Sequence, residues 1–480
     1  MRFSMFFCKK ILSKVSLSQY STILQILTSK NFKRSVTVTD YPDLSVTRKV
    51  RFSRVFRKNT LICTTLVHYS FILCTPLVQF NYLCNKNITI MDISLIEFME
   101  SQLKLTTSTF HRYMYNQVSW ESRMFGLVGP RGVGKSTMIL QYIKDNRDKR
   151  HMLYVAADHL YFSTHTLIDT VDEFVKDGGE QIFIDEIHKY ENWSRELKLI
   201  YDHHPDLKVG FTGSSILDIT KGASDLSRRA LIFTMQGLSF REYLALFHNI
   251  TAPVYTINDV LDHKAKLDTI SHPLPFFKDY LKNGYYPFAG EGGYEMRLRQ
   301  VINQTMEVDI PQYANMNAST GRKLKKLLAV IAQSVPFKPV MESLATVIGV
   351  SRNVLPAYFL YMEQAGMIGQ LRDDTGGIRG LGKVEKVYLD NTNLAYLLGH
   401  ESADIGNIRE TFFYNQMRVK TDVISSRISD FEIDGKTFEV GGKKKKQKQI
   451  QDAAQGYVVK DDIETGYGNI IPLWQFGLTY

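Results

Sequence analysis

"MFGLVGPRGVGKSTMIL", residues 124 to 140, is the stretch that decides the fold. It combines an apolar strand, a glycine-rich turn and a segment whose apolar residues recur at helical spacing. The phosphate-loop pattern G-x-x-x-x-G-K-[ST] is complete in it, with Gly129, Gly134, Lys135 and Ser136. Glycines let backbone N–H groups approach phosphate oxygens closely, and the N-terminus of the following helix adds a favourable dipole. The stretch therefore predicts a nucleotide-binding loop.

Two side chains of this loop have distinct expected roles. Lys135 should reach the β- and γ-phosphates, and the Ser136 hydroxyl should hold Mg²⁺. The loop as a whole is expected to contact ATP through Gly129, Pro130, Arg131, Gly132, Val133, Gly134, Lys135, Ser136 and Thr137. ATP and Mg²⁺ are therefore the predicted cofactors.

A carboxylate pair follows a second apolar strand in "EQIFIDEIHKYENW", residues 180 to 193. In a parallel sheet, Asp185 and Glu186 would lie at the carboxyl end of that strand, beside the phosphate loop. Asp185 is expected to hold Mg²⁺, and Glu186 is expected to polarise the attacking water as general base. Because nucleotide binding alone would need only Asp185, the second carboxylate predicts hydrolysis.

A third strand, "LKVGFTGSSIL" (residues 207 to 217), ends in small polar residues. Ser214 is our first candidate for a hydrogen bond to the γ-phosphate or the attacking water, and Ser215 is the alternative. The segment "SDLSRRALIF" (residues 224 to 233) follows. Either Arg228 or Arg229 could supply positive charge to the transition state, or both could be ordinary surface residues.

These motifs together resemble the AAA-superfamily ATPases of bacteria and archaea that carry a C-terminal domain of unknown function. The resemblance also includes "FIDEIHKYENWSRELKLIYD" (183–202), "TGSS" (212–215), "GLSFREYL" (237–244) and "NGYYPFA" (283–289), and it extends over residues 91 to 480. It implies an ATPase in which "GLSFREYL" has an architectural role. It also implies a C-terminal half with a winged helix and a PD-(D/E)XK nuclease-like domain.

Residues 340 to 371 have the spacing of a helix–turn–helix. Gly349 would permit the tight turn, and Ser351 would cap the second helix. The stretches 366–371 and 383–389 predict two strands of a hairpin, which completes a winged helix. Arg352 and Asn353 are the candidates for reading bases in a major groove. Pro356 near the start of that helix and a hairpin with little positive charge favour protein docking or packing instead.

The last eighty residues predict a helix carrying Glu410 and a hairpin carrying Asp430 and Glu439. Nucleases of this kind hold metal with a strand aspartate and an E-x-K pair. Gly441 occupies the lysine position here, and Lys443 would approach from a different part of the turn. We therefore expect a degenerate, nuclease-like domain, with Lys443–Lys446 and Asp461–Asp462 at the surface.

The N-terminal 90 residues differ from the rest in composition. They carry 14 Lys and Arg against 2 Asp and Glu and contain no Gly, Ala or Glu, whereas the remaining residues have a net charge of −2. All four cysteines lie here: Cys8, Cys63, Cys74 and Cys84. An uncharged run from Thr60 to Asn85 follows a basic cluster, as in a membrane anchor. We expect translated upstream sequence with Met91 as the start; an anchor or a targeting segment are the alternatives.

The predicted fold class is α/β, with a parallel P-loop NTPase sheet of AAA type followed by helical, winged-helix and small α+β nuclease-like parts. The expected boundaries are 1–90 for the extension, 91–250 for the ATPase, 251–315 for a helical linker, 316–400 for the winged helix and 401–480 for the nuclease-like domain. The predicted function is Mg²⁺-dependent ATP hydrolysis coupled to the C-terminal modules, in the cytoplasm and without a membrane. A slow ATP-gated DNA-binding regulator and an ATP-dependent nuclease are the alternatives. Nucleic acid, a protein and further copies of the chain are the candidate partners.

Overall fold

The computed structural model divides into two compact units, Met1–Ile88 and Thr89–Tyr480. It describes residues 92–480 except 214–225, 227, 315, 334–337, 375–382, 400–403, 446–449 and 452. In the first unit it describes only the strand pair β1 (Phe56–Arg57) and β2 (Thr60–Leu61). The four cysteines and the start at Met91 therefore lie outside the described residues. No helix in the described ranges has the length and apolar content that crossing a bilayer requires.

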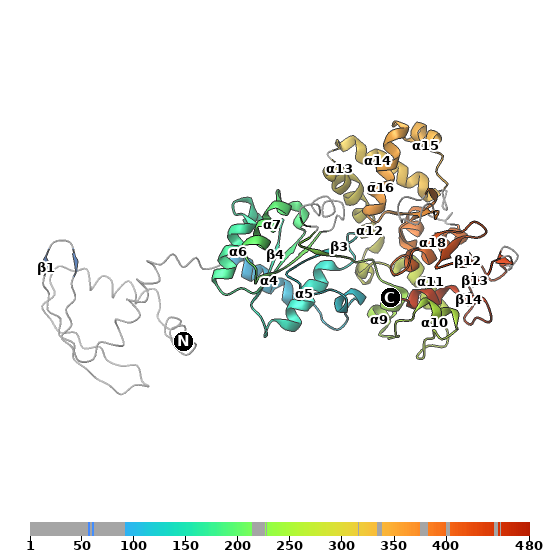
Figure 1. Ribbon diagram of the computed structural model, residues 1–480, viewed down its shortest axis with the longest axis horizontal. Coiled ribbons are helices and arrows are strands. Elements are labelled where there is room, and N and C mark those ends of the chain that lie inside the picture. Colours follow the sequence, from blue (N-terminus) through green and yellow to red (C-terminus); the bar gives the residue numbers. More distant parts are fainter. Residues whose placement is uncertain are drawn as a thin grey trace. The chain divides into compact units, whose positions relative to one another are not determined.

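The first domain of the second unit is built on a five-stranded sheet with the order β4-β5-β6-β3-β7, in which all neighbours are parallel. The strands are β3 (Met124–Val128), β4 (Met152–Ala156), β5 (Gln181–Asp185), β6 (Lys208–Thr212) and β7 (Leu231–Thr234). Helices α4 (Ile93–Leu105), α5 (Lys135–Asn146), α6 (Leu167–Lys176) and α7 (Trp193–His203) surround it (Figure 1). All five residues of β3 and of β5 are buried, as expected for strands covered on both faces. The predicted α/β fold class is confirmed.

A helical segment follows the sheet. It contains α9 (Phe240–His248), α10 (Ile257–Leu261), α11 (Leu274–Asn283), the 3₁₀ turn η4 (Pro287–Gly290), α12 (Tyr294–Gln304), the π-helical turn η5 (Thr305–Asp309) and α13 (Ile310–Tyr313). The start of α9 is fixed by a capping box, in which Ser239 accepts from the Glu242 N–H and Glu242 accepts from the Ser239 N–H. Gly237 precedes it because a Cβ there would lie 2.4 Å from the Tyr285 ring. "GLSFREYL" is therefore an architectural element.

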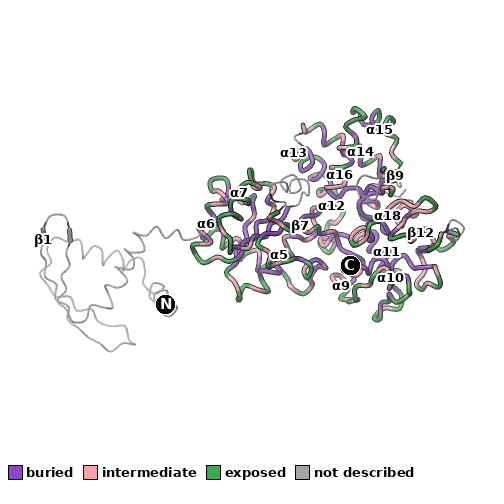
Figure 2. The backbone as a smooth tube through the Cα atoms, in the orientation of Figure 1, coloured by how far each residue is buried: buried purple, intermediate pink, exposed green. Residues whose placement is uncertain are grey.

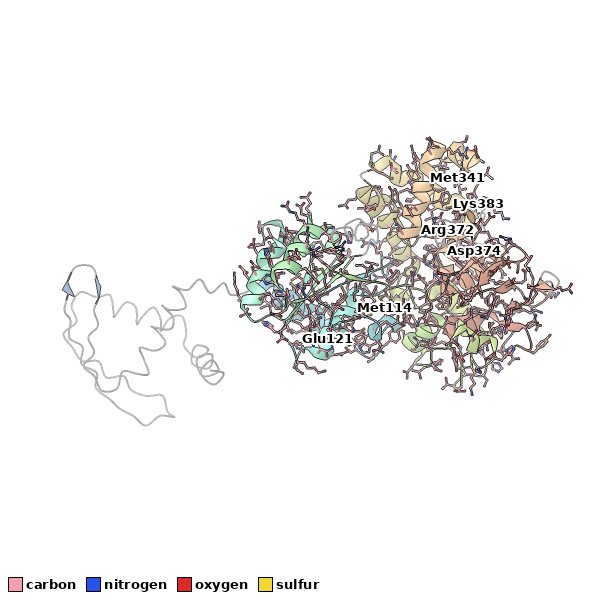
Figure 3. All side chains as sticks on the ribbon, in the orientation of Figure 1. Met114, Glu121, Met341, Arg372, Asp374 and Lys383 are labelled. Carbon is pink, nitrogen blue, oxygen red and sulfur yellow. The ribbon has the colours of Figure 1, made fainter. Side chains whose placement is uncertain are left out.

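The next unit contains three helices and two antiparallel strands. They are α14 (Ala318–Gln333), α15 (Met341–Ile348), the 3₁₀ turn η6 (Arg352–Val354), α16 (Leu355–Gln364), β8 (Ile368–Arg372) and β9 (Val384–Leu389). Figure 3 labels Met341, Arg372 and Lys383 on this unit. Gly349 ends α15 in the left-handed conformation, with φ +73°, as the tight turn requires. Ser351 lies at the N-cap position of η6, which leads directly into α16, but its side chain makes no capping hydrogen bond. The winged-helix assignment stays a prediction.

The C-terminal part contains α17 (Thr392–Gly399), α18 (Ile405–Met417) and a second five-stranded sheet, against which α18 packs. The sheet order is β10 (Ile424–Ser425), β11 (Phe431–Ile433), β12 (Lys436–Gly441), β13 (Gly456–Lys460) and β14 (Ile470–Pro472), antiparallel up to β12 and parallel beyond it. Most of α18 and the 3₁₀ segment η10 (Leu473–Leu478) is buried (Figure 2). Tyr480 is fully buried against α9, where its carbonyl oxygen accepts hydrogen bonds from Ser239 Oγ and Arg241 Nε, both at 2.8 Å.

Candidate functional site

The glycine-rich turn between β3 and α5 has backbone conformations that favour glycine at Gly129, Gly132 and Gly134. Gly129 has φ +150°, and a Cβ there would lie 2.1 Å from the Met235 carbonyl oxygen. Gly134 has φ +95° and forms the N-cap of the 12-residue helix α5. The turn therefore leads the chain directly into a helix N-terminus, where backbone N–H groups face outward and attract anions.

Lys135 is buried, and its ammonium folds back over the turn. Its Nζ donates to the carbonyl oxygens of Gly129 at 3.0 Å and Pro130 at 2.8 Å. Burial lowers the pKa of Lys135 to about 8, although the nearby carboxylates of Glu186 and Asp185 act in the opposite direction. Ser136, the next residue, is half-buried, and Thr137 is exposed. A phosphate bound in this loop would place negative charge beside the buried ammonium of Lys135 and so stabilise its charged form.

Asp185, at the carboxyl end of β5, is held by two hydroxyl groups. Tyr154 of β4 donates to its Oδ2 at 2.6 Å, and Thr212 of β6 donates to its Oδ1. Strands β4 and β6 both pair with β5, so hydroxyl groups from the two neighbouring strands fix the Asp185 carboxylate. It lies at the carboxyl ends of the strands, where ligands bind in parallel sheets. Thr212 is the last residue of β6, and the sequence alone indicated no role for its hydroxyl group.

Glu186 leaves the strand in the left-handed conformation, with φ 51°, and its N–H donates to Thr212 Oγ1 at 3.2 Å. Its Oε2 lies 3.4 Å from Lys189 Nζ, 3.8 Å from His188 Nε2 and 3.9 Å from an Arg131 Nη2. Burial by itself raises the pKa of Glu186, but the surrounding positive charges outweigh it and the net pKa is lowered. Glu186 is therefore kept as a carboxylate, which is the state a general base needs.

The outer side of the turn is covered by residues from the C-terminal half. A Cβ on Gly132 would lie 2.7 Å from the Phe288 ring, and a Cβ on Gly366 would lie 2.4 Å from the Pro130 ring. Arg131 pairs with Asp309 of η5, with Nη2 3.2 Å from Oδ2. Asp309 lies 178 residues further along the chain, and no sequence pattern indicated it.

A buried ion pair between Arg112 and Glu242 stabilises the glycine-rich turn. Arg112 Nε lies 2.9 Å from Glu242 Oε1, and both side chains are almost inaccessible to solvent. Arg112 also donates to the carbonyl oxygens of Val133, of Gln236 at 2.7 Å and of Gly237 at 2.9 Å. Arg112 therefore connects the phosphate loop to the start of α9, a role that sequence analysis missed.

The structure does not bring every predicted residue into this site. Ser214 and Ser215 lie outside the described residues. β7 runs parallel to β3, so Arg228 and Arg229, which precede it, lie at the amino ends of the strands, whereas the phosphate loop follows the carboxyl end of β3. Arg229 donates through two nitrogens to Asp202, each at 3.1 Å. The transition-state role expected of these two arginines therefore has no support from the geometry within one chain.

The carboxylates predicted for the nuclease-like part are engaged by lysines. Lys386 of β9 lies 3.2 Å from Glu410 Oε2 and 3.1 Å from Asp430 Oδ1. Glu439 is buried and pairs with Lys445, while Lys443 is exposed. Among the described residues, no group of three or more His, Cys, Asp or Glu side chains has an arrangement suited to a metal ion.

Asp461 corrects a further expectation. It is buried and pairs with Arg409 at 2.9 Å, whereas we expected a surface carboxylate. Its neighbour Asp462 is half-buried, with 41% of its side chain exposed, and its Oδ1 lies 3.0 Å from Lys278 Nζ. The apolar residues before Asp461 predict only a strand. They carry no information about Arg409, which comes from α18 and pairs with the Asp461 carboxylate.

Three basic side chains of the unit formed by α14–β9 are paired with carboxylates. Arg352 lies 2.6 Å from Glu342, Arg372 lies 2.9 Å from Glu363, and Lys383 lies 3.0 Å from Glu385 (Figure 3). The helix α16, with the sequence LPAYFLYMEQ, carries no basic residue. Arg352, the candidate for reading bases, is therefore engaged by a carboxylate, and α16 has no positive charge of its own for a phosphate backbone.

Two family models match parts of the chain. Residues 121–244 match the model described as AAA domain, and residues 275–404 match one described as a domain of unknown function, DUF8612. The uncharacterized protein MJ1637 of Methanocaldococcus jannaschii is 28% identical over 250 residues, which are 48% of this chain and 52% of that protein. The chain thus matches about half the length of this curated relative. Residues 121–244 of the first domain are thus similar to AAA domains, as the resemblance implied.

Three solved structures are similar at low overlap. AMPPCP-bound DnaA from Aquifex aeolicus has 11% identity and a TM-score of 0.21, covering 52% of this chain and 84% of that chain. The S. cerevisiae Hsp104-ADP complex has 14% identity and a TM-score of 0.25 over 56% and 38%. C. elegans PCH-2 has 15% identity and a TM-score of 0.21 over 56% and 68%. These TM-scores are too low to define a shared overall arrangement.

Proposed function

We propose that the protein binds ATP at the β3–α5 loop and hydrolyses it with Mg²⁺, with Glu186 as the general base. The observation that carries this proposal is the position of Glu186, whose negative charge interacts with Lys135 of the loop and with the neighbouring Lys189. The lysine of the loop and the proposed carboxylate base are therefore close enough for their charges to interact. Water attacks the γ-phosphorus in line with the bond to the leaving ADP oxygen, Glu186 accepts a proton from that water, and Lys135 stabilises the charge that develops on the phosphate oxygens.

The residues present fit a magnesium ion. Ser136 and Asp185 offer only oxygen atoms, which are the ligands that Mg²⁺ prefers, and the hydroxyls of Tyr154 and Thr212 fix the orientation of the Asp185 carboxylate. When bound, the ion would neutralise charge on the β- and γ-phosphates. Ser136 would hold it from the loop and Asp185 from the end of β5.

Removal of divalent cations tests the proposed reaction directly. The full-length protein should release phosphate from ATP with Mg²⁺ present and lose at least about a hundredfold in rate with EDTA, because the ion contributes several kcal/mol to charge stabilisation. Readdition of Mg²⁺ should restore the rate. Turnover that continues in EDTA, or no turnover under either condition, would reject the proposed reaction.

Lys135→Ala should weaken ATP binding about 10- to 150-fold, which is the value of a charge-assisted hydrogen bond lost from a buried site. Lys149→Ala, at an exposed position beyond the same helix, is the control and should bind ATP normally. Both are measured by titration of ATP into the full-length protein. Unchanged affinity in Lys135→Ala would mean that the loop does not hold the phosphates.

The lowered pKa of Lys135 also predicts how binding depends on pH. Phosphates favour the charged form, so binding raises a pKa that stands at about 8 in the free protein. The ATP affinity of the wild-type protein should therefore fall as the pH rises above about 8, and Lys135→Ala should lack this decline.

We also propose that the nucleotide state is transmitted to the C-terminal half, as the contacts of Phe288, Asp309 and Gly366 with the loop support. The alternative of metal-dependent DNA cleavage is disfavoured, because Lys386 and Lys445 neutralise the candidate carboxylates. An ATP-gated DNA-binding role is disfavoured by the ion pairs of Arg352 and Arg372. Docking of a protein partner and assembly of several copies stay predictions.

A further inference from the structure

The guanidinium of Arg131 lies between two carboxylates from different parts of the chain. It makes two hydrogen bonds to Asp309, from Nε to Oδ2 at 3.2 Å and from Nη2 to Oδ1 at 3.3 Å. The same Nη2 lies 3.9 Å from Glu186 Oε2, beyond the length of a hydrogen bond. Arg131 thus forms a two-point pair with Asp309 and only a longer electrostatic contact with Glu186.

The Asp309 carboxylate is itself held in place. It is the last residue of the π-helical turn η5, and its side chain is 8% exposed. The Gln304 amide donates to its Oδ1 at 3.2 Å, one turn earlier along the same helical run. A π-helical turn widens the helix locally and is often retained where a side chain must be directed to a functional group. The support of Asp309 is therefore independent of the phosphate loop.

We infer that Asp309 is a positioning residue for hydrolysis, because it holds the Arg131 guanidinium near Glu186 but out of direct contact with it. This inference rests on the proposed function. The fork of an arginine matches a carboxylate at two points, so the bond to Asp309 fixes both the place and the plane of the guanidinium. The pair with Asp309 thereby keeps the Arg131 guanidinium from forming a two-point pair with the Glu186 carboxylate, which should accept the proton.

Loss of the Asp309 carboxylate has a definite consequence. Glu186 is the next anion within reach of Arg131, at 3.9 Å. A direct two-point pair between them would occupy the oxygens that should accept the proton, and it would withdraw the cation from the phosphates. Turnover should fall while ATP still binds through Lys135 and the backbone of the loop.

A double-mutant cycle on the full-length protein tests this inference. Asp309→Asn keeps the size of the side chain and should lower kcat roughly tenfold, the scale of coupling between residues in one ion-pair network, with KM for ATP within about twofold. Arg131→Ala removes the cation. If Asp309 acts through Arg131, the double variant should have the same kcat as Arg131→Ala alone.

Glu307→Gln is the matched control, because Glu307 belongs to the same π-helical turn but is 44% exposed and pairs with Lys325. It should leave kcat and KM unchanged. Losses that add in the double variant, or an Asp309→Asn protein with wild-type kcat, would overturn the inference. A raised KM with unchanged kcat would overturn it too, since that pattern indicates a structural role in binding. These results leave wild-type turnover intact, whereas failure of the proposed function would appear as a wild-type protein without turnover.

Discussion

Glu186→Gln is expected to bind ATP with nearly wild-type affinity and to release phosphate about 10²- to 10⁴-fold more slowly, the usual contribution of a general base. Glutamine has the shape of glutamate but no carboxylate, so it cannot accept a proton from water. The backbone N–H of residue 186 would still donate to Thr212, which preserves the local turn. Phosphate release and ATP titration on the same preparation separate the two effects.

Glu191→Gln provides the comparison, because Glu191 is an exposed carboxylate five positions further on. That variant should release phosphate at the wild-type rate. Wild-type turnover in Glu186→Gln would mean that another group activates the water. Loss of ATP binding in Glu186→Gln would instead mean that Glu186 shapes the loop rather than performing the reaction.

Arg112→Ala should reduce the free energy of unfolding by about 3–5 kcal/mol, the cost of removing one partner of a buried ion pair. The change leaves the Glu242 carboxylate buried with its charge uncompensated. It also leaves the carbonyl oxygens of Val133, Gln236 and Gly237 without their guanidinium donor. Urea denaturation of the full-length variant beside the wild type measures the difference.

Arg147→Ala is the surface control, because Arg147 is 48% exposed and pairs with Glu100 at 2.9 Å. It should cost no more than about 1 kcal/mol. Equal losses in the two variants would show that the Arg112 pair contributes no more than a surface pair. A change in ATP affinity is also expected for Arg112→Ala alone, since Arg112 donates to the carbonyl oxygen of Val133 within the phosphate loop.

Local patterns were sufficient to predict the phosphate loop and the carboxylate pair. Each depends on a strand, its carboxyl end and the next few residues, so neighbours in the sequence are neighbours in the site. Arg112 and Asp309 could not be predicted this way, because their partners lie 130 and 178 residues away. An ion pair over such distances depends on how separate elements pack, and a single sequence carries no signal for it.

In the C-terminal part, too, the sequence predicted helices and strands but not the ion pairs between distant residues. The helix carrying Glu410 and the hairpin with Asp430 and Glu439 were predicted together with the nuclease-like resemblance, and a helix and an antiparallel strand pair form there. Lys386, which neutralises both carboxylates, comes from β9, whose sequence indicated only a strand. Lys445 rather than Lys443 reaches Glu439, because the direction of a side chain in a turn depends on the backbone there and not on spacing.

The burial of Tyr480 against α9 bears on how the chain is made. Ser239 donates to the Tyr480 carbonyl oxygen across 241 residues, and the Tyr480 hydroxyl donates to the Gly237 carbonyl oxygen across 243 residues. Synthesis proceeds from the N-terminus, so α9 leaves the ribosome long before these contacts are possible. Contacts so distant in sequence form late and slow the folding of a chain. The Ser239 hydroxyl and the Gly237 carbonyl oxygen therefore gain these partners late in folding, after the local contacts of the first domain have formed.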